Sequence, residues 1–259
     1  MSLPVAVSHP VSVAAWGWLT CAVLLACAIA AAVIGHRRLR GEAARLAAWW
    51  WALGLLVAAP LSFFALLTTI VVRDTPSWDM SILRTVARHQ GHRATVAVIS
   101  AFGSWEVVSL LLCVTLGLLL GARLNRQAAF VLAATLASMA ASGIMKLVVA
   151  RPRPEVVRQA PGSFSFPSGH TMSATGFAVA LAIVFWPTRW RWPALVAAAL
   201  YAAAIGLSRV YLTVHYPSDV LGGWALSLAV VGLVWLLFWG RLDVPPGMRR
   251  PDTALDWRL

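Results

Sequence analysis

An arginine, a histidine and a carboxylate lie within twelve residues, in the pattern Ser208-Arg209-x5-His215-x3-Asp219. The guanidinium presents a planar fork of donors to phosphate oxygens, and Ser208 can donate a further hydrogen bond. His215 and Asp219 have the spacing of one helical face, so the carboxylate can orient the imidazole. Pro217 is expected in a helix's first turn, where the helix dipole alone would also favour Asp219. The pattern predicts a site for phosphoryl chemistry.

A second motif, Lys146-x6-Arg153-Pro154, contains the only lysine among 21 lysine and arginine residues. Lys146 falls near the end of an apolar stretch, where a cation is costly unless an anion offsets it. Snorkelling to the membrane interface is the alternative for this side chain. At 100° per residue Arg153 returns to the Lys146 face of a helix, whereas Arg151 lies about 140° away. Arg153 is the predicted phosphate ligand, and Arg151 is the alternative if Pro152 ends the helix early.

The third motif is Pro167-Ser168-Gly169-His170, directly before another apolar stretch. Ser168 can cap the following helix, and Gly169 lets backbone N–H groups approach a ligand. Such a helix N-terminus is an anion site, and His170 beside it could protonate a leaving alkoxide or phosphate. A capping motif with an incidental histidine is the alternative. Together the three motifs supply three cations, two imidazoles and one acid.

Few acids lie near these motifs, since only Glu155 and Asp219 stand close to them in the sequence. A two-metal phosphatase needs several carboxylates, so we expect catalysis without a metal or other cofactor. His89 and His92 have the look of a metal pair, but neither a cysteine nor an acid completes a ligand set beside them. A solvated loop is the preferred interpretation of that segment.

The composition is that of an integral membrane protein. Of the 259 residues, 60% are hydrophobic and 12% charged, and the mean hydropathy is +0.78. A spanning helix needs about 20 mainly apolar residues. The windows that meet this length are roughly 14–34, 49–72, 98–121, 128–149, 171–187, 194–212 and 220–239. The formal charge of +12 comes from arginines scattered through short loops, which excludes a nucleic-acid partner and leaves the bilayer.

Basic clusters alternate along the connections between these windows, and basic residues accumulate on the cytoplasmic side. The clusters are His36 to Arg40, Arg123 to Arg126, Arg189 to Arg191 and the tail from Arg241 to Arg258. The outside then keeps 1–13, 73–97, 150–170 and 213–219, so all three motifs face one compartment. The first thirteen residues carry no Lys or Arg, which favours a retained first span, an external N-terminus and a cytoplasmic C-terminus.

Segment 73–97 differs from the spans. Its apolar residues recur at helical spacing between charged ones, which predicts an amphipathic helix on the outer surface. These apolar residues are Trp78, Ile82, Leu83, Val86 and Ala87. The helix would either guide a lipid headgroup or pack over the bundle.

With these motifs in order and at the right spacing, the chain resembles the type-2 phosphatidic acid phosphatase superfamily. That family includes bacterial lipid phosphatases and vanadium-dependent haloperoxidases, and the resemblance covers roughly residues 73–240. It implies an all-α integral membrane fold, with a six-helix transmembrane core plus one extra N-terminal transmembrane helix. The expected divisions are 1–48 for that helix and a basic cytoplasmic loop, 49–242 for the lipid phosphatase domain, and 243–259 for a cytoplasmic tail.

The resemblance also implies roles for the motif residues. His215 would be a nucleophile that forms a phosphohistidine, Asp219 would orient it, and His170 would act as acid and then base. The phosphoryl oxygens would be held by Lys146, Arg153, Arg209, Ser168 and Gly169, with Ser208 as a further donor. Histidine is a known covalent nucleophile, and fixed cations suit a transition state whose charge is spread over equatorial oxygens.

We therefore expect a phosphatase of the bacterial plasma membrane, acting at its outer face on a lipid phosphate or diphosphate, with undecaprenyl diphosphate as the first candidate. Phosphatidylglycerophosphate, phosphatidic acid and lipid A phosphates are alternatives, because the motifs address only the phosphoryl group. A phosphotransferase would resolve the same intermediate with an alcohol. A haloperoxidase would need a soluble vanadate site, and a lipid transporter would use the cations to bind headgroups.

Overall fold

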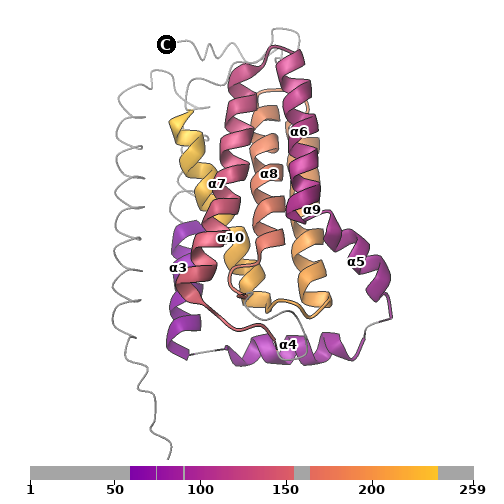
Figure 1. The fold of residues 1–259 in the computed structure, drawn as a ribbon, viewed down its shortest axis with the longest axis vertical. Helices are drawn as coiled ribbons and strands as arrows, with labels where there is room; N and C mark the ends of the chain where they lie inside the picture. The colour runs from indigo at the N-terminus through magenta and orange to yellow at the C-terminus, as the bar shows by residue number, and fades with distance from the viewer. Residues whose placement is uncertain (1–58, 74, 90, 155–163, 239–259) are drawn as a thin grey trace, which may run out of the picture.

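A computed structural model describes residues 59–73, 75–89, 91–154 and 164–238. Within them the chain forms α-helices. The helices are α3 (Ala59–Arg73), α4 (Ser77–Ala87), α5 (Arg93–Ala101), α6 (Trp105–Gly121), α7 (Asn125–Val149), α8 (Gly169–Phe185), α9 (Arg191–Tyr211) and α10 (Pro217–Leu237). The predicted all-α class is confirmed for these ranges (Figure 1). The predicted span 14–34, the basic loop after it and the tail 243–259 lie outside the described residues.

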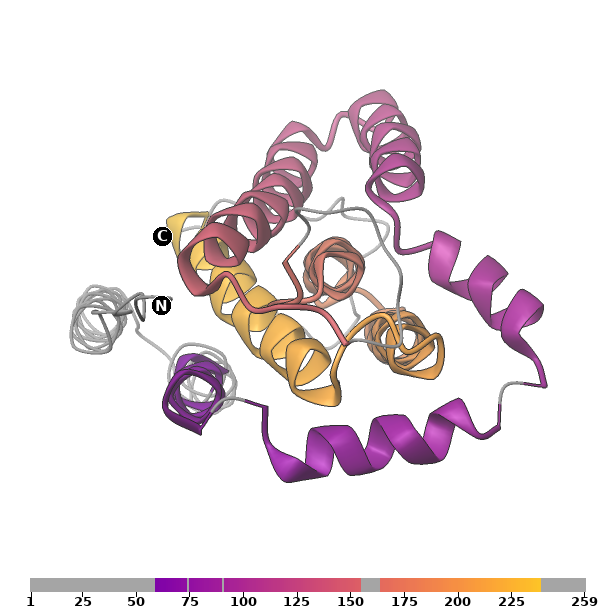
Figure 2. The ribbon, with the colours of Figure 1, turned by 60° about the horizontal axis from the view of Figure 1, so that its bottom comes forward.

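Helix α8 lies in the middle of the bundle, with α6, α7, α9 and α10 around it (Figure 2). Its sequence GHTMSATGFAVALAIVF is rich in small residues, which lets neighbouring backbones approach closely. At Gly176 an added Cβ would lie 2.5 Å from the Ser138 hydroxyl of α7, so only glycine fits there. Phe130, Phe177 and Val231 fill the core where α7, α8 and α10 meet.

In the part of the chain that the structure describes, three helices, α7, α9 and α10, are long and apolar enough to cross a membrane, and α8 is a shorter apolar helix. They begin two or three residues before the predicted windows. The predicted single helix 98–121 is instead two, α5 and α6, bent by 45°, which would make a fourth span if counted together. The break has a local cause, because Ser104 caps α6 by accepting a hydrogen bond from the Val107 N–H at 3.3 Å.

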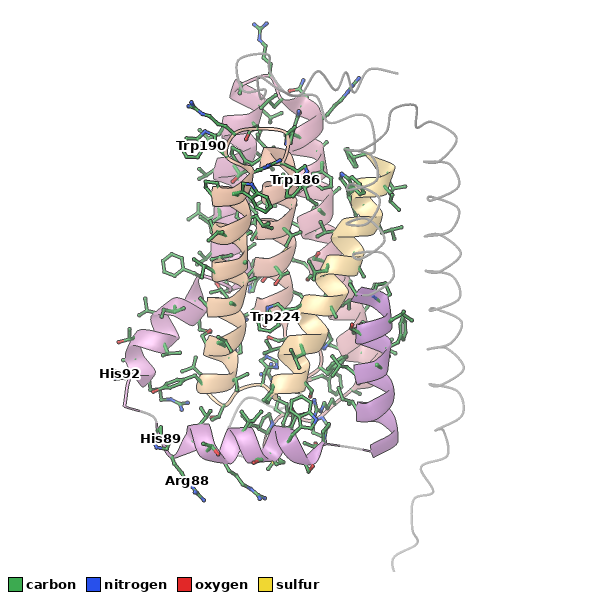
Figure 3. The ribbon with its side chains drawn as sticks, turned by 180° about the vertical axis from the view of Figure 1, so that it is seen from behind. Arg88, His89, His92, Trp186, Trp190 and Trp224 are labelled. Atoms are coloured by element: carbon green, nitrogen blue, oxygen red, sulfur yellow. The ribbon has the colours of Figure 1, made fainter. Side chains whose placement is uncertain are left out.

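The two ends of the bundle differ in character. The connections after α6 and after α8 lie at one end, while α4 and the loops that carry the three motifs lie at the other (Figure 1). Trp186 and Trp190 mark the first end, and Arg88, His89 and His92 lie near the second (Figure 3). The motifs therefore share one end of the bundle, opposite Arg123 and Arg189, as the charge alternation predicts.

The predicted amphipathic helix in 73–97 is present as α4, which crosses the end of the bundle, and α5 continues the segment (Figure 2). Of its apolar residues only Leu83 is buried, against Val210, Tyr216 and Val220, while Trp78 and Ile82 are exposed. The other buried residue of α4 is Asp79. No group of three or more metal-ligating side chains occurs in the described ranges, and His89 is exposed, with Nδ1 3.0 Å from the Thr85 carbonyl.

Candidate active site

The loop after α7 begins with a left-handed residue. Ala150 has φ 48° and ψ 32°, and its N–H donates to the Lys146 carbonyl at 2.9 Å. The chain then leaves the helix axis, so residues 151–154 are not helical. We predicted that Arg153 returns to the Lys146 face of a helix. This prediction is wrong, because the helix ends before Arg151 and Arg153. The choice has to be made from contacts.

The loop after α9 uses the same device. Thr213 has φ 59°, and the N–H groups of Thr213 and Val214 donate to the carbonyls of Val210 and Arg209 at 2.9 and 3.2 Å. This pair of bonds is a Schellman motif that closes the helix and reverses the chain. His215 follows two residues later, and α10 then begins at Pro217. The left-handed turns at Ala150 and Thr213 thus bring the segment with Arg153 and the segment with His215 next to each other.

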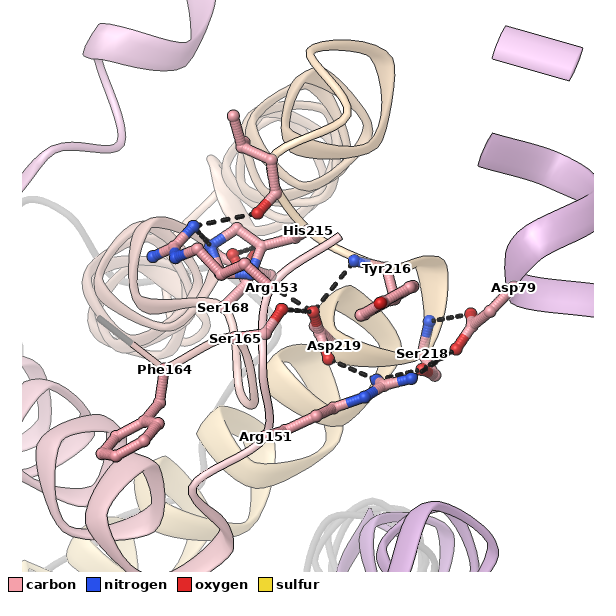
Figure 4. Close-up of polar contacts among 12 residues, drawn as sticks. Asp79, Arg151, Arg153, Phe164, Ser165, Ser168, His215, Tyr216, Ser218 and Asp219 are labelled. Atoms are coloured by element: carbon pink, nitrogen blue, oxygen red, sulfur yellow. Dashed lines mark hydrogen bonds and ion pairs between the residues drawn. The ribbon is translucent and has the colours of Figure 1, made fainter. Parts of the chain in front are cut away.

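His215 is held at both ring nitrogens and is 1% exposed. Nδ1 lies 3.3 Å from Asp219 Oδ2, and Nε2 lies 3.3 Å from Arg153 Nη1 (Figure 4). A guanidinium can only donate, so Nε2 must carry the lone pair and Nδ1 the proton that goes to Asp219. Asp219 thus lies where it can orient the imidazole, and Nε2 keeps its lone pair.

Burial sets the ionisation of this histidine. It lowers the pKa of His215 to about 4, and the hydrogen bond and negative charge of Asp219 offset only part of that shift. The imidazole is therefore neutral at physiological pH, the state that a nucleophile needs. Burial also lowers the pKa of the Arg153 guanidinium, and the charge of Asp219 opposes this.

Asp219 is fully buried and accepts hydrogen bonds from several directions. Oδ2 receives the Tyr216 N–H at 2.9 Å and the Ser165 hydroxyl, besides its contact with His215. Oδ1 receives Nη1 of Arg151 at 2.5 Å. With its lone pairs this well occupied, the carboxylate has a fixed orientation. Ser165 was not among the predicted site residues, and it comes from the loop before α8.

The cations gather around this pair. Lys146 Nζ donates to the Phe164 carbonyl at 2.7 Å, and Arg209 Nη1 donates to the Ser100 hydroxyl at 2.5 Å. Arg153 Nη1 also donates to the Val214 carbonyl at 2.9 Å. The charges of Arg153, Arg209 and Asp219 all act on Lys146, so the three predicted cations form one cluster with the acid. Ser100, from α5, was not among the predicted site residues either.

The N-terminus of α8 borders the cluster. Ser168 occupies the N-cap position, but its side chain makes no capping bond. Its hydroxyl instead accepts from the Thr171 hydroxyl at 2.9 Å, and its N–H donates to the Asp219 carbonyl at 3.1 Å. A Cβ at Gly169 would lie 3.7 Å from Cε of Lys146, so the lysine crosses this helix end. His170, in the first turn, is partly buried, and its ring has no hydrogen-bond partner in the described ranges.

Ser208, a predicted phosphate ligand, and Arg151, the alternative to Arg153, already use their donors within the protein. The Ser208 hydroxyl donates to the Ile205 carbonyl at 2.6 Å within α9, so its proton is already used. Arg151 is 5% exposed and bonds to Asp219, Ser218 and Asp79, on the side of Asp219 away from His215 (Figure 4). These contacts favour Arg153 over Arg151 as the phosphate ligand.

A cluster of cations lies beside a buried Asp–His pair at one end of an apolar helical bundle, and comparisons with known proteins give the class to which this arrangement belongs. The model of the PAP2 superfamily matches residues 127–243. Decaprenylphosphoryl-5-phosphoribose phosphatase of Mycobacterium tuberculosis is 31% identical over 149 residues, which are 56% of this chain and 79% of the relative. The chain belongs to the PAP2 superfamily and is a multi-pass membrane protein.

Other relatives align over shorter segments. Phosphatidylglycerophosphatase B of Bacillus subtilis is 35% identical over 35% of this chain and 48% of the relative. Undecaprenyl-diphosphatase of Sulfolobus acidocaldarius is 32% identical over 32% of this chain and 42% of the relative. The chain thus spans about half or less of the length of these two proteins.

One solved structure shares the fold. It is the crystal structure of a transmembrane PAP2-type phosphatidylglycerolphosphate phosphatase from Bacillus subtilis, with a TM-score of 0.61 and 26% identity. The match covers 69% of this chain and 93% of that one.

Proposed function

We propose that this protein is a membrane lipid phosphatase that hydrolyses a phosphomonoester or diphosphate of a lipid through a phosphohistidine. The observation that carries the proposal is the state of His215, which is buried, neutral and held with the Nε2 lone pair toward a cluster of cations. Proximity and a fixed tautomer are what a histidine nucleophile requires.

In the first step Nε2 of His215 attacks phosphorus, and the bond from phosphorus to the leaving oxygen breaks. His170 reacts in its protonated form, which the negative charge of the bound phosphoryl group stabilises against the surrounding cations, and it gives its proton to that oxygen. Asp219 accepts the hydrogen bond from Nδ1 and stabilises the positive charge that grows on the His215 ring. Arg153 must turn from Nε2 toward the phosphoryl oxygens, which replaces its 3.3 Å contact with His215 by charge-assisted bonds to substrate. Lys146 and Arg209 hold the remaining oxygens.

In the second step water attacks the phosphohistidine. His170, now without its proton, takes one from the water, the bond from phosphorus to Nε2 breaks, and inorganic phosphate leaves. His170 regains its proton and His215 its lone pair, so the cycle closes. The Gly169 N–H, at the start of α8, and the Ser168 hydroxyl, which only accepts in its bond from Thr171, can donate to the phosphoryl oxygens.

Undecaprenyl diphosphate remains the first substrate to test. Two of the relatives are named for polyprenyl substrates, and another is named for phosphatidylglycerophosphate. The proposed ligands address the phosphoryl group and do not distinguish one lipid tail from another. The residues of the site therefore support the proposed reaction class, and the similar proteins support the proposed class of lipid.

Metal-independent chemistry is part of the proposal. Among the residues that the structure describes, the buried acids near the site are Asp79 and Asp219, and both are bonded to Arg151. Their oxygens neutralise a guanidinium, whereas a hard divalent cation needs several carboxylate oxygens of its own. The phosphoryl charge is met by lysine and arginine instead.

The membrane arrangement is proposed with it. Seven spans, the first two beginning before residue 59, would give a six-helix core plus one added N-terminal helix. The site end would face the periplasm or exterior, because Arg123, Arg126, Arg189 and Arg191 flank the opposite end. The N-terminus would then be external and the C-terminus cytoplasmic, in a bacterial plasma membrane.

Phosphate release from purified lipids in EDTA tests the function. The panel is undecaprenyl diphosphate, phosphatidylglycerophosphate, phosphatidic acid and lipid A phosphate. We expect release by the wild type, loss in His215→Ala and His170→Ala, and no loss in His89→Ala, the control at an exposed histidine outside the cluster. If the lipid carries a labelled phosphate and this label moves only to an added alcohol, the protein is a phosphotransferase. Full activity in His215→Ala, or lipid binding without release, would reject catalysis by this site.

A further inference from the structure

Arg151 joins two buried carboxylates from distant parts of the chain. Its Nη1 lies 2.5 Å from Asp219 Oδ1, and its Nη2 lies 3.0 Å from Asp79 Oδ2. Nη1 also donates to the Ser218 hydroxyl at 2.8 Å, and the guanidinium carbon lies 4.0 Å from the centre of the Tyr216 ring. Figure 4 shows the guanidinium between the two acids. Arg151 is 5% exposed, so these contacts occupy it within the protein.

The position of Arg151 separates it from the phosphate ligands. Asp219 offers Oδ1 to Arg151 and Oδ2 to His215, so the arginine lies behind the carboxylate. The bond from Nη1 to Oδ1 opposes rotation of the carboxylate and holds Oδ2 toward Nδ1 of His215, while Nη2 anchors the guanidinium on Asp79. Arg151 therefore acts on the imidazole through Asp219.

Asp79 completes the arrangement from α4. It is fully buried, and its Oδ1 accepts the Ser218 N–H at 2.9 Å, while Oδ2 accepts the Ser218 hydroxyl and Arg151. Two acids and one arginine leave a net charge of about one negative unit at pH 7. If Asp79 were absent, Arg151 would neutralise Asp219 alone, and less negative charge would remain for the ring of His215. If Arg151 were absent, two buried carboxylates would lack their cation, which is strongly unfavourable.

We propose that Arg151 is a positioning residue for the Asp219–His215 pair and that Asp79 of α4 is the counter-ion that holds Arg151 in place. The inference rests on the proposed function for its meaning in catalysis. It also makes the seating of the surface helix α4 a condition for a correctly oriented nucleophile.

Other charges face His215 and stay unchanged in the test. They are Asp219 of α10, Arg153 of the segment after α7, Arg209 of α9, Lys146 of α7 and His170 of α8. A shift in the ionisation of His215 in a variant of Asp79 or Arg151 therefore reports the cluster behind Asp219.

Steady-state kinetics over pH compare Asp79→Asn, Arg151→Lys and the double variant Arg151→Met/Asp79→Asn with the wild type. The double variant removes one negative and one positive charge, so the net charge of the cluster is unchanged. Asp219 loses its arginine but keeps its hydrogen bonds from the Tyr216 N–H and the Ser165 hydroxyl, so we expect the protein to keep its fold. In the double variant we expect kcat to fall about 100-fold with KM little changed, because Asp219 loses its fixed orientation. Arg151→Lys keeps the positive charge but loses the planar guanidinium that bridges the two acids. Its kcat should lie between that of the wild type and that of the double variant.

Asp79→Asn gives a signed result. The neutral amide can still accept from Ser218, but Arg151 then acts wholly on Asp219, so the pKa of His215 falls. The acid limb of kcat/KM should move to lower pH in this variant and stay in place in Arg84→Met, a control at an exposed arginine of the same helix. A lower melting temperature with unchanged kcat and acid limb would show a purely structural role and overturn the inference. A rise in KM alone would make Arg151 a substrate ligand and overturn it too.

Nitrogen-15 NMR of labelled histidine gives a readout that needs no turnover. In the wild type His215 should show the Nδ1–H tautomer, and the double variant should show a mixture of tautomers. The same tautomer and the same ionisation pH in wild type, Asp79→Asn and the double variant would overturn the inference even if no lipid is hydrolysed. Failure of the proposed function would appear separately, as absence of phosphate release by the wild type.

Discussion

The two histidines of the site are held in different ways. His215 lies in a turn, is 1% exposed, and has Asp219 on one ring nitrogen and Arg153 on the other. His170 lies in the first turn of α8, is partly buried, and its ring has no hydrogen-bond partner among the residues that the structure describes. One imidazole is fixed before substrate arrives, and the other is free to pair with it.

This difference matches two chemical tasks. A nucleophile gains from a fixed tautomer and a fixed approach, because the cost of ordering it has been met during folding. A group that first gives a proton to a leaving oxygen and then takes one from water must change partners within each cycle. A permanent hydrogen bond would hinder that exchange. The contrast between His215 and His170 supports the proposed roles of nucleophile and of acid and base with an observation that does not depend on family resemblance.

The largest expected effect is at His215. His215→Asn should lower kcat by about 10⁶-fold on every lipid phosphate, because removal of a nucleophile eliminates the covalent route. No acid-labile phosphoenzyme should be trapped with phosphorus-32 substrate, while His92→Asn, the control outside the cluster, should still label. Labelled phosphohistidine in the His215→Asn protein would reverse the assignment of the two histidines.

His170→Asn should give a smaller and more selective defect. Loss of a general acid costs about 10²- to 10⁴-fold with an alkoxide leaving group. With p-nitrophenyl phosphate, whose leaving group needs no proton, phosphorylation of His215 should recover, and the phosphoenzyme should accumulate because its hydrolysis still lacks a base. Rapid-quench measurement of labelled protein checks this. An equal loss on both substrates without accumulation would mean that His170 only binds phosphate.

The ionisation of His215 predicts the response to acid. In the folded protein the pKa of His215 is about 4, below the ordinary value of 6.5 for histidine, because the ring is buried. As pH falls from 6.5 toward 4 the unfolded chain takes up a proton that the folded protein does not, so this group makes the fold less stable across that window. The melting temperature of the wild type should fall more steeply there than that of His215→Gln. Parallel curves would show that His215 is not buried in its neutral form.

In the same window kcat/KM should stay level as far as His215 is concerned. Below pH 4 it should fall about tenfold per unit, because protonation removes the lone pair from Nε2. An acid limb near pH 6.5 in the wild type that coincides with protonation of the His215 ring, followed by nitrogen-15 NMR, would contradict the depressed pKa.

Much of this arrangement could be predicted from the sequence. Long apolar runs gave the positions of α7, α9 and α10, because lipid admits few other structures. Charge alternation predicted that the three motifs share one end, and the motifs themselves contained His215, Asp219 and their cations. These are local patterns, which one segment carries by itself.

Contacts between distant segments were harder to predict. Arg151 and Asp79 are 72 residues apart, and nothing in the pattern of α4 distinguishes an acid that pairs with a buried arginine from one that faces water. Ser100 and Ser165 likewise acquire their meaning only through Arg209 and Asp219. The left-handed turns were missed because alanine and threonine occupy positions where glycine is the usual signal.

Glycine substitutions at these two left-handed turns have the smallest expected effect. They compare the backbone before the two loops of the site, as the histidine variants compare side chains. Ala150 is exposed, and a left-handed conformation costs a non-glycine residue about 1–2 kcal/mol. Glycine returns part of this through the greater freedom of the unfolded chain, so Ala150→Gly should stabilise by about 0.5–1 kcal/mol. Thermal unfolding in detergent should show a rise of about 2–4 °C with unchanged activity.

Thr213→Gly should behave differently, although its φ of 59° is equally strained. Thr213 is 2% exposed, and its hydroxyl donates to the Leu212 carbonyl at 2.7 Å, so glycine there removes buried contacts as well as strain. We expect no gain in melting temperature and a fall in kcat, because the turn before His215 loosens. A gain equal to that of Ala150→Gly, with full activity, would show that the side chain of Thr213 does nothing to hold the nucleophile and that Asp219 and Arg153 suffice.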